Sequence, residues 1–396
     1  MLWPPAGSRR RDFVLTGGNM RGTTHGVTAR RVRAALGAAV AVCAVTAALP
    51  GAAWAGPAGA AGTAGTAGTA TVGVERISVA PDGTQGDGGS GAASITPDGR
   101  RVVFSSSARN LTPDSPAGNE AVFVRDQQTA LTKRMGTYTP LQPPAISGNG
   151  AYVGYSLQWI NDVRIRQYQV SSGGTASANC SAYSCDQPSL NGDGRYTALA
   201  LLMRKPAPTN RQSVEVHDWN TGAVVTVASF EHTYPARPSI SGDGRYVAYQ
   251  DGAAKDVFVW DRTTGTSTGP VEGPATAASL VQLSDDGGTA VYLSGSHTYV
   301  HDLRSGTTRT VTDVKGLAVD PTGRHLLYAP NGTGGPSLVL RDLETGTDQV
   351  VSDRPATAGI DAVSTGGRDV VFQSAADDIV PGDTNGTSDV FVRHLF

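Results

Sequence analysis

The sequence predicts an all-β fold, a seven-bladed β-propeller made of four-stranded blades. Three observations support this prediction. A short strand followed by a Gly-rich turn recurs seven times at a mean spacing of about 45 residues, which is the length of one propeller blade. Alternating apolar residues follow each copy, as expected for half-buried strands. The seventh copy lacks its last strand, whereas an unassigned strand precedes the first copy.

Each copy contains a turn of the form Pro/Gly-Asp-Gly or a near equivalent, in which the last glycine accepts a positive φ. The clearest copy is Ser-Ile-Ser-Gly-Asp-Gly-Arg at 239–245. A third strand follows and ends in aspartate, as at Asp261, and the motif Asp-x-x-Thr/Ser-Gly then predicts a turn into a fourth strand. The copies begin at Ser94, Ala145, Ser189, Ser239, Gln282, Ala318 and Ala362.

The ends of the repeat region predict how the ring closes. The seventh copy ends with the third strand at 389–394, and only Leu395 and Phe396 follow it. The segment 74–79 has the pattern of a fourth strand but has no blade of its own. We expect this N-terminal strand to complete the last blade, because closure removes two exposed strand edges. The predicted propeller therefore spans residues 74–396.

Residues 1–55 have the features of a signal peptide. Seven arginines and a single acid, Asp12, lie in this segment, and the apolar run at 34–49 is too short for a confident membrane span. The sequence Ala53-Trp54-Ala55 matches a cleavage site. We expect cleavage near Ala55–Gly56, a secreted chain without a membrane span, and a flexible Gly/Ala/Thr-rich linker at 56–73.

Composition and cysteine content narrow the class further. Of the 396 residues, 39% are hydrophobic and 17% are charged, with 50 glycines and 23 prolines. This composition excludes fibrous and disordered classes. Beyond the leader, Cys180 and Cys185 are the only cysteines, and an oxidising compartment predicts a local disulfide between them.

The repeats resemble those of the TolB-like propeller family, also described as WD40-like or PD40 repeats. The resemblance rests on the Asp-Gly-Arg turns, the hydrophobic strand after them and the aromatic-rich strand that ends in aspartate, and it covers about 74–396. This motif occurs in proteins of many functions, so it implies the fold alone. Most Trp-Asp signatures of true WD40 repeats are absent, and Trp260-Asp261 is a single instance.

The sequence offers little support for catalysis. It contains no Gly-x-Ser-x-Gly elbow, and its histidines are scattered. We therefore assign no catalytic residue and expect no cofactor. The one candidate metal site is a calcium loop formed by Asp383, Asn385 and Asp389. The corresponding loop of blade 1 has no ligands at these positions, where it carries Ser115, Ala117 and Ala121.

Binding residues are expected on the face that carries the second-to-third loops and the interblade loops, here called the loop face. These loops vary in length and carry aromatic and basic residues, which are favoured in contacts. The candidates are Trp159, Tyr183, Arg204, Lys205, His232 and Tyr234.

Two functions follow from this surface. The favoured one is a secreted, monomeric, non-enzymatic scaffold that binds an extracellular protein, peptide or cell-wall glycan. The alternative is a propeller enzyme of lyase or lactonase type with its site at the central channel. The acidic excess beyond the leader argues against a nucleic-acid partner.

Overall fold

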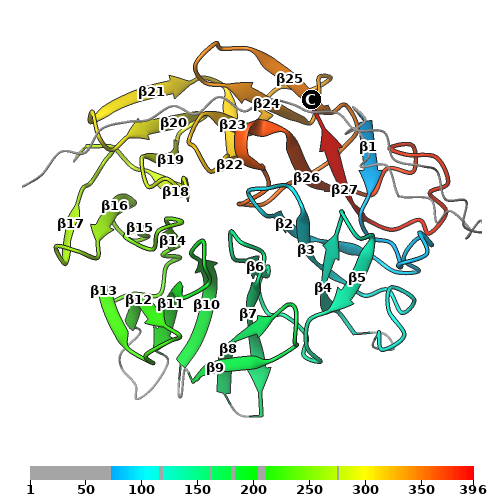
Figure 1. Ribbon diagram of the computed structural model, residues 1–396. Helices are drawn as coiled ribbons and strands as arrows, with labels where there is room; N and C mark the ends of the chain where they lie inside the picture. The colour runs from blue at the N-terminus through cyan, green and yellow to red at the C-terminus, as the bar shows by residue number, and fades with distance from the viewer. Residues whose placement is uncertain (1–72, 116–118, 161, 180–182, 204–210, 274–275) are drawn as a thin grey trace, which may run out of the picture. The chain divides into compact units, whose positions relative to one another are not determined.

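The computed structural model describes residues 73–115, 119–160, 162–179, 183–203, 211–273 and 276–396. These residues form antiparallel sheets arranged as the blades of a seven-bladed β-propeller (Figure 1), which confirms the predicted fold class. Among them, no helix is long and apolar enough to cross a membrane. The predicted leader at 1–55 and nearly all of the predicted linker lie outside the described residues.

Blades 1 to 6 are each built from an inner, a second, a third and an outer strand, and blade 7 has a second, a third and an outer strand. The inner strands of blades 1 to 6 are β2 (Ser90–Ile95), β6 (Ala145–Ile146), β10 (Tyr183–Leu190), β14 (Ser239–Ile240), β18 (Ser279–Leu283) and β22 (Val314–Val319). The second strands are β3 (Arg101–Ser106), β7 (Tyr152–Trp159), β11 (Tyr196–Met203), β15 (Tyr246–Asp251), β19 (Thr289–Ser294), β23 (His325–Pro330) and β26 (Asp369–Ser374).

The remaining strands complete the blades in chain order. The third strands are β4 (Ala121–Asp126), β8 (Asp162–Gln169), β12 (Arg211–Asp218), β16 (Asp256–Asp261), β20 (His297–Asp302), β24 (Leu338–Asp342) and β27 (Asp389–His394). The outer strands are β5 (Leu131–Arg134), β9 (Thr175–Asn179), β13 (Val224–Phe230), β17 (Thr266–Thr268), β21 (Thr307–Val311), β25 (Asp348–Ser352) and, for blade 7, β1 (Gly73–Arg76).

Buried side chains gather between neighbouring blades. One such cluster joins Val257 and Val259 of blade 4 to Leu280 and Leu283 of blade 5. The alternation of strand side chains explains this arrangement, because each blade has two faces and both must be covered by a neighbour.

The repeated turn is held by one small polar network. In blade 4, the Ser241 hydroxyl donates to Asp243 (2.6 Å) and accepts from the Tyr246 amide (2.9 Å). Asp243 also accepts from the Arg245 amide (2.8 Å). The turn glycine, Gly244, has φ of 70°, which a residue with a Cβ rarely adopts. The Ser-Gly-Asp-Gly sequence thus satisfies its own backbone inside a buried hairpin.

The arginine after the turn explains why the third strand ends in aspartate. Arg245 pairs with Asp261 at 2.7 Å, and this contact holds the pKa of Asp261 well below its ordinary value. The Asp261 carboxylate also accepts from the Thr263 amide (2.8 Å) in the next turn. The same arginine–aspartate pair joins the equivalent residues of blades 1, 3 and 6, namely Arg100 and Asp126, Arg195 and Asp218, and Arg324 and Asp342.

The turns of neighbouring blades also bond to one another. The Gly192 amide donates to the Gly242 carbonyl (2.8 Å), and the Gly242 amide donates to the Asp285 carbonyl (2.7 Å). A Cβ at residue 192 would lie 2.7 Å from the Gly242 oxygen. Glycine is therefore required there by the close approach of two backbones.

The N-terminal strand closes the ring. β1 pairs antiparallel with β27, with Gly73 opposite His394 and Arg76 opposite Phe391, and the two strands lie side by side in Figure 1. The observed strand ends at Arg76, earlier than the predicted 74–79, although the Ile77 amide still donates to the Val390 carbonyl (2.7 Å). The inner strand of blade 7 is reduced to a bridge between Val363 and Val370.

Blade 7 carries a different residue at the end of its third strand. His394 stands where blades 1, 3, 4, 5 and 6 carry aspartate, and its Nδ1 lies 2.7 Å from Asp369 Oδ1. Its Nε2 lies 3.9 Å from Glu75 Oε2 on the closing strand. These contacts, mainly that with Asp369, raise the pKa of His394 to about 9.

This contact predicts a pH-dependent contribution to stability. The ordinary histidine pKa is about 6.5, so the stabilisation is complete below that pH and is lost as the pH rises through about 9. We expect the free energy of unfolding of the native chain to exceed that of His394→Gln by roughly 1–2 kcal/mol at pH 6. At pH 10 the two free energies of unfolding should be almost equal. Urea unfolding of both chains across this range measures the difference. A stability difference that does not change with pH would contradict the raised pKa of His394.

The contacts between turns predict that Gly192→Ala is destabilising. The added methyl must displace the Gly242 carbonyl, so we expect a loss of about 1–3 kcal/mol and a lower Tm. Gly332→Ala is the matched control, because nothing lies within 4 Å of a Cβ at that position. Equal Tm values for the two variants would show that the turns of neighbouring blades can move apart without loss of stability.

Candidate functional site

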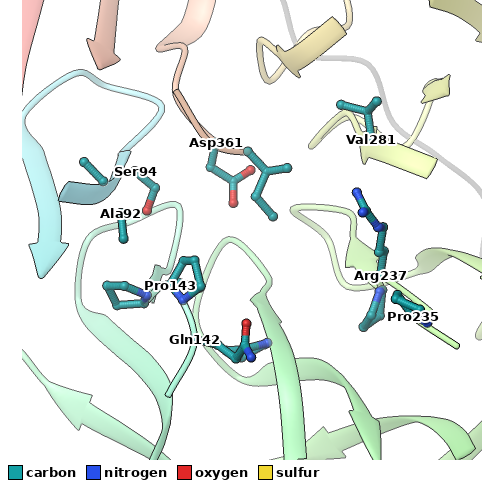
Figure 2. Close-up of a pocket in the computed structure, with 15 residues that line it drawn as sticks. Ala92, Ser94, Gln142, Pro143, Pro235, Arg237, Val281 and Asp361 are labelled. Atoms are coloured by element: carbon teal, nitrogen blue, oxygen red, sulfur yellow. The ribbon is translucent and has the colours of Figure 1, made fainter. Parts of the chain in front are cut away.

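A pocket of about 330 Å³ opens where the interblade segments reach the axis on the loop face. We call it the channel-mouth pocket. Figure 2 shows its polar residues, among them Ser94, Gln142, Arg237 and Asp361, around a common space. Its walls are largely apolar and come from blades 1 to 5 and 7: Ala92, Ala93, Pro143, Pro144, Ala145, Pro188, Pro235, Pro238, Val281, Gly359 and Ile360.

The lining of this pocket departs from the repeat. The residue just before each repeat copy occupies the same position in every blade, and it is proline in blades 2, 3 and 4. In blade 7 it is an acid. In blade order these residues are Ala93, Pro144, Pro188, Pro238, Val281, Leu317 and Asp361. The fold needs no charge here, because six blades lack one, so Asp361 is a feature of the pocket.

Backbone strain gathers at the same place. Ala92, Arg237 and Asp361 have φ of 50°, 46° and 55°, a region that residues with a Cβ rarely occupy. Seven such non-glycine residues occur in the described part of the chain, and three of them line this one pocket. Strained residues of this kind concentrate at binding and active sites, where the surrounding structure holds them in place.

Ser94 is the clearest polar feature of the pocket. Its side chain is only 4% exposed, and within the described residues its hydroxyl has no hydrogen-bond partner. The equivalent serines are satisfied: Ser189 accepts from the Ile240 amide (3.1 Å), and Ser239 accepts from the Leu283 amide (3.0 Å). A buried hydroxyl without a partner costs free energy that a ligand could recover.

Asp361 is held in place by a glutamine of blade 5. Gln282 takes the serine position in blade 5, and its Nε2 donates to Asp361 Oδ1 (2.7 Å). The Gln282 side-chain oxygen accepts from the amides of Val319 (3.2 Å) and Asp361 (3.3 Å). Gln282 thus ties blades 5, 6 and 7 together beneath the pocket. Burial raises the pKa of Asp361 to about 6.

The channel below the pocket is nearly filled. Only about 20 Å³ remains, roughly enough for one water molecule. Apolar residues of the inner strands fill the rest, with Asp285 and Asp361 facing the remaining space. Burial, followed by the charge of Asp361, raises the pKa of Asp285 to about 7. The channel-mouth pocket is therefore closed on the side that faces the channel.

Two of the predicted binding residues contact each other and are close in sequence to the pocket wall. His232 stacks on Phe230 (ring centroids 5.1 Å apart) and lies 5.5 Å from the Tyr234 ring. Its Nε2 lies 2.8 Å from Asp251 Oδ1. Tyr234 is 59% exposed and directly precedes Pro235 in the pocket wall. Phe230, His232 and Tyr234 therefore form a row of aromatic rings whose last member directly precedes the pocket wall in sequence.

The other predicted binding residues do not join this row. Trp159 packs on Tyr138 (5.3 Å between ring centroids), in the apolar cluster between blades 1 and 2. Tyr183 begins β10. Arg204, Lys205 and Cys180 lie outside the described residues, whereas Cys185 is buried. The disulfide stays a prediction of the sequence.

The predicted calcium loop contains an internal ion-pair network. Arg76 NH2 lies 3.1 Å from Asp383 and its Nε lies 3.2 Å from Asp389. Gln85 donates to both carboxylates (2.8 and 2.7 Å), and Asn385 donates to the Gly86 carbonyl (2.9 Å). These contacts join the segment after β1 to the blade 7 loop. Calcium binding stays a prediction.

Solved structures show where this architecture recurs. No family model matches the chain, and no curated protein sequence is significantly similar to it. An oligogalacturonate lyase in complex with manganese has a TM-score of 0.60 and 14% identity, covering 82% of this chain and 93% of its own. The oligogalacturonate lyase of Vibrio parahaemolyticus has a TM-score of 0.59 and 11% identity, covering 81% and 93%.

A third similar structure is TolB from Acinetobacter baumannii, with a TM-score of 0.43 and 15% identity, covering 66% of this chain and 62% of its own. At these identities the two lyases show the fold alone. The seven blades, together with the Asp-Gly-Arg hairpins of blades 1, 3 and 4, agree with the TolB-like repeat resemblance.

The pocket residues do not form a manganese site. Asp361 is the single carboxylate among the lining residues, and no histidine or cysteine joins it. In the described ranges, no three histidine, cysteine, aspartate or glutamate side chains gather as a metal site requires.

None of the pocket residues is predicted from the sequence as a ligand contact. A usable signal was present in the aligned repeats, where proline precedes three successive copies and aspartate precedes the seventh. The missing partner of Ser94 leaves no signal in the sequence, because the serine itself is common to blades 1, 3 and 4.

The carboxyl pair beneath the pocket predicts a measurable coupling. In Asp361→Asn, the charge that helps to raise the pKa of Asp285 is removed, so this pKa should fall below about 7. It should stay above its ordinary value, because burial is the larger cause. Carboxyl-carbon NMR titration of ¹³C-aspartate protein measures both chains. An unchanged Asp285 titration would show that the two groups do not interact.

Proposed function

We propose that this chain is a secreted, non-enzymatic binding protein that recognises a protein, peptide or glycan partner at the channel-mouth pocket. Secretion is inferred from the leader at 1–55. The observation that carries the binding proposal is Ser94, a buried hydroxyl without a partner in the described structure, facing a pocket with strained walls. Binding a ligand group there would satisfy this hydroxyl.

The pocket is suited to one small group of a larger partner. Its volume of about 330 Å³ is at the low end for a small-molecule site, which fits one sugar ring or one or two peptide residues. The proline and aliphatic side chains of the walls would pack against the apolar part of the bound group. Asp361 and Ser94 would form hydrogen bonds with its polar groups. The rest of the partner would extend over the exposed ring of Tyr234.

The alternative is a lyase-type enzyme with its site at the same pocket. Two oligogalacturonate lyases among the similar structures support it, and a carboxyl group with a pKa of about 6 is suited to act as a general base. The binding proposal uses the same residue as a hydrogen-bond acceptor, so only product formation separates the two readings.

The test is a binding panel that contains galacturonate oligomers, cell-wall glycan fragments and short peptides, measured with the full chain by calorimetry. For any ligand that binds, we expect Ser94→Ala to weaken affinity about five- to tenfold. Its Tm should be unchanged or higher, because a buried unpaired hydroxyl is removed.

Ser189→Ala is the matched control. It removes a hydroxyl that accepts from the Ile240 amide, so it should lower stability by about 1 kcal/mol and leave affinity unchanged. Equal affinity of Ser94→Ala and the native chain for every bound ligand would refute the pocket as the binding site. Formation of an unsaturated uronate from the galacturonate oligomers, lost in Asp361→Asn, would establish the enzyme instead.

A further inference from the structure

A second, separate groove lies between blades 1 and 2. Its volume is about 240 Å³, and its lining includes Arg134 and Gly136 of blade 1 and Arg166 and Tyr168 of blade 2. Thr175, also in the lining, lies opposite Tyr168 in the pairing of β8 with β9. None of these residues contributes to the channel-mouth pocket.

The hydroxyl of Tyr168 is a hydrogen-bond donor in the lining of this groove. Its side chain is 3% exposed, and its hydroxyl has no hydrogen-bond partner in the part of the chain that the structure describes. The ring stacks on Tyr155 at 5.2 Å between centroids and 8° between planes, while the Tyr155 hydroxyl donates to the Met135 carbonyl (2.8 Å). Gly136 makes room for Tyr168, because a Cβ there would lie 2.3 Å from the hydroxyl.

Two positive charges converge on the same groove. Arg134 donates through NH1 to the Asp114 backbone carbonyl, but its Nε is buried without a partner among the described residues. Arg166 donates through Nε to Ser177 (3.1 Å), and its guanidinium lies 4.7 Å from the Trp159 ring centroid. Burial raises the pKa of Tyr155, and both arginines oppose this rise, so both charges are close to it.

Among the described residues, the positive charges of this groove have no carboxylate counterpart. The contacts that the structure gives these two arginines are to a carbonyl, a hydroxyl and aromatic rings, and none of them carries a full negative charge. Elsewhere in the propeller, the arginines of the repeat turns pair with aspartates. Two neighbouring guanidinium groups beside a buried hydroxyl donor form the donor set that suits an oxyanion.

We propose that this groove binds an oxyanion, such as the phosphate, sulfate or carboxylate group of a small molecule or glycan, between Arg134, Arg166 and the Tyr168 hydroxyl. The guanidinium groups supply charge-assisted hydrogen bonds, and the hydroxyl supplies a third donor. Trp159 and Tyr138 hold the Arg166 guanidinium from the side, each at 4.7 Å. The groove's volume of about 240 Å³ leaves space beyond the oxyanion for part of the molecule that carries it.

The test uses the full chain with inorganic phosphate, sulfate and acetate as separate probes, each at constant ionic strength set with chloride. We expect saturable binding of at least one probe by calorimetry, and a rise in Tm with its concentration. A preference for phosphate or sulfate would indicate an ester oxyanion, whereas a preference for acetate would indicate a carboxylate. The absence of saturable binding by all three would overturn the proposal.

Three variants locate the site. Arg134→Gln and Arg166→Gln should each weaken binding by about tenfold or more, and Tyr168→Phe by about fivefold. Tyr168→Phe retains the stacked ring, so it tests the hydroxyl even if an arginine variant folds poorly. Native affinity in Tyr168→Phe together with native affinity in the arginine variants would refute this site.

Two comparisons exclude a purely structural role. Arg309→Gln replaces an exposed arginine on the outer strand β21 of blade 5, and it should bind the probe as the native chain does. In chloride alone, Arg134→Gln should have a Tm close to that of the native chain, because the one hydrogen bond that the structure gives Arg134 is an exposed contact to a backbone carbonyl. A lower Tm in chloride with an undiminished response to the probe would show that Arg134 acts only in folding.

Discussion

The pairing of β1 with β27 is the interaction on which the rest of the propeller depends. Each blade packs between two neighbours, so an open array would leave two blade faces and two strand edges uncovered. The closing strand comes from the other end of the chain, and Arg76 secures it through ion pairs with Asp383 and Asp389. The channel-mouth pocket needs this closure directly, because Ser94 belongs to blade 1 and Asp361 to blade 7. The complete pocket therefore exists only in the closed ring.

The features that could be predicted well from the sequence are those formed by contacts within a single blade. The hairpin at 239–245 is fixed by residues within a few positions of one another, and so is the turn after Asp261. Even the shared strand of blade 7 was predictable, since one strand was missing and one was left over. The end of β1 at Arg76 was not, because the segment that follows turns away to bond with the blade 7 loop.

The candidate site could not be predicted in the same way, because it depends on differences between blades. The pocket is made where Asp361 replaces an uncharged residue and where Ser94 lacks the partner that Ser189 and Ser239 find in the next blade. The groove between blades 1 and 2 has the same origin, since Arg134 and Arg166 come from different blades. In the regular parts of the blades, the polar groups form hydrogen bonds with one another. Positions where a buried polar group lacks such a bond are therefore where other molecules are expected to bind.

The geometry of the closing ladder has a mechanical consequence. Gly73 faces His394 at one end of the β1–β27 pair, so both ends of the propeller leave from the same end of this ladder. Tension applied between the two termini would pull the strands apart one hydrogen-bonded pair at a time, instead of loading all pairs together in shear. A ring that is stable to heat or denaturant would thus open at low force when pulled by its ends, and its first loss would be the edge of blade 7.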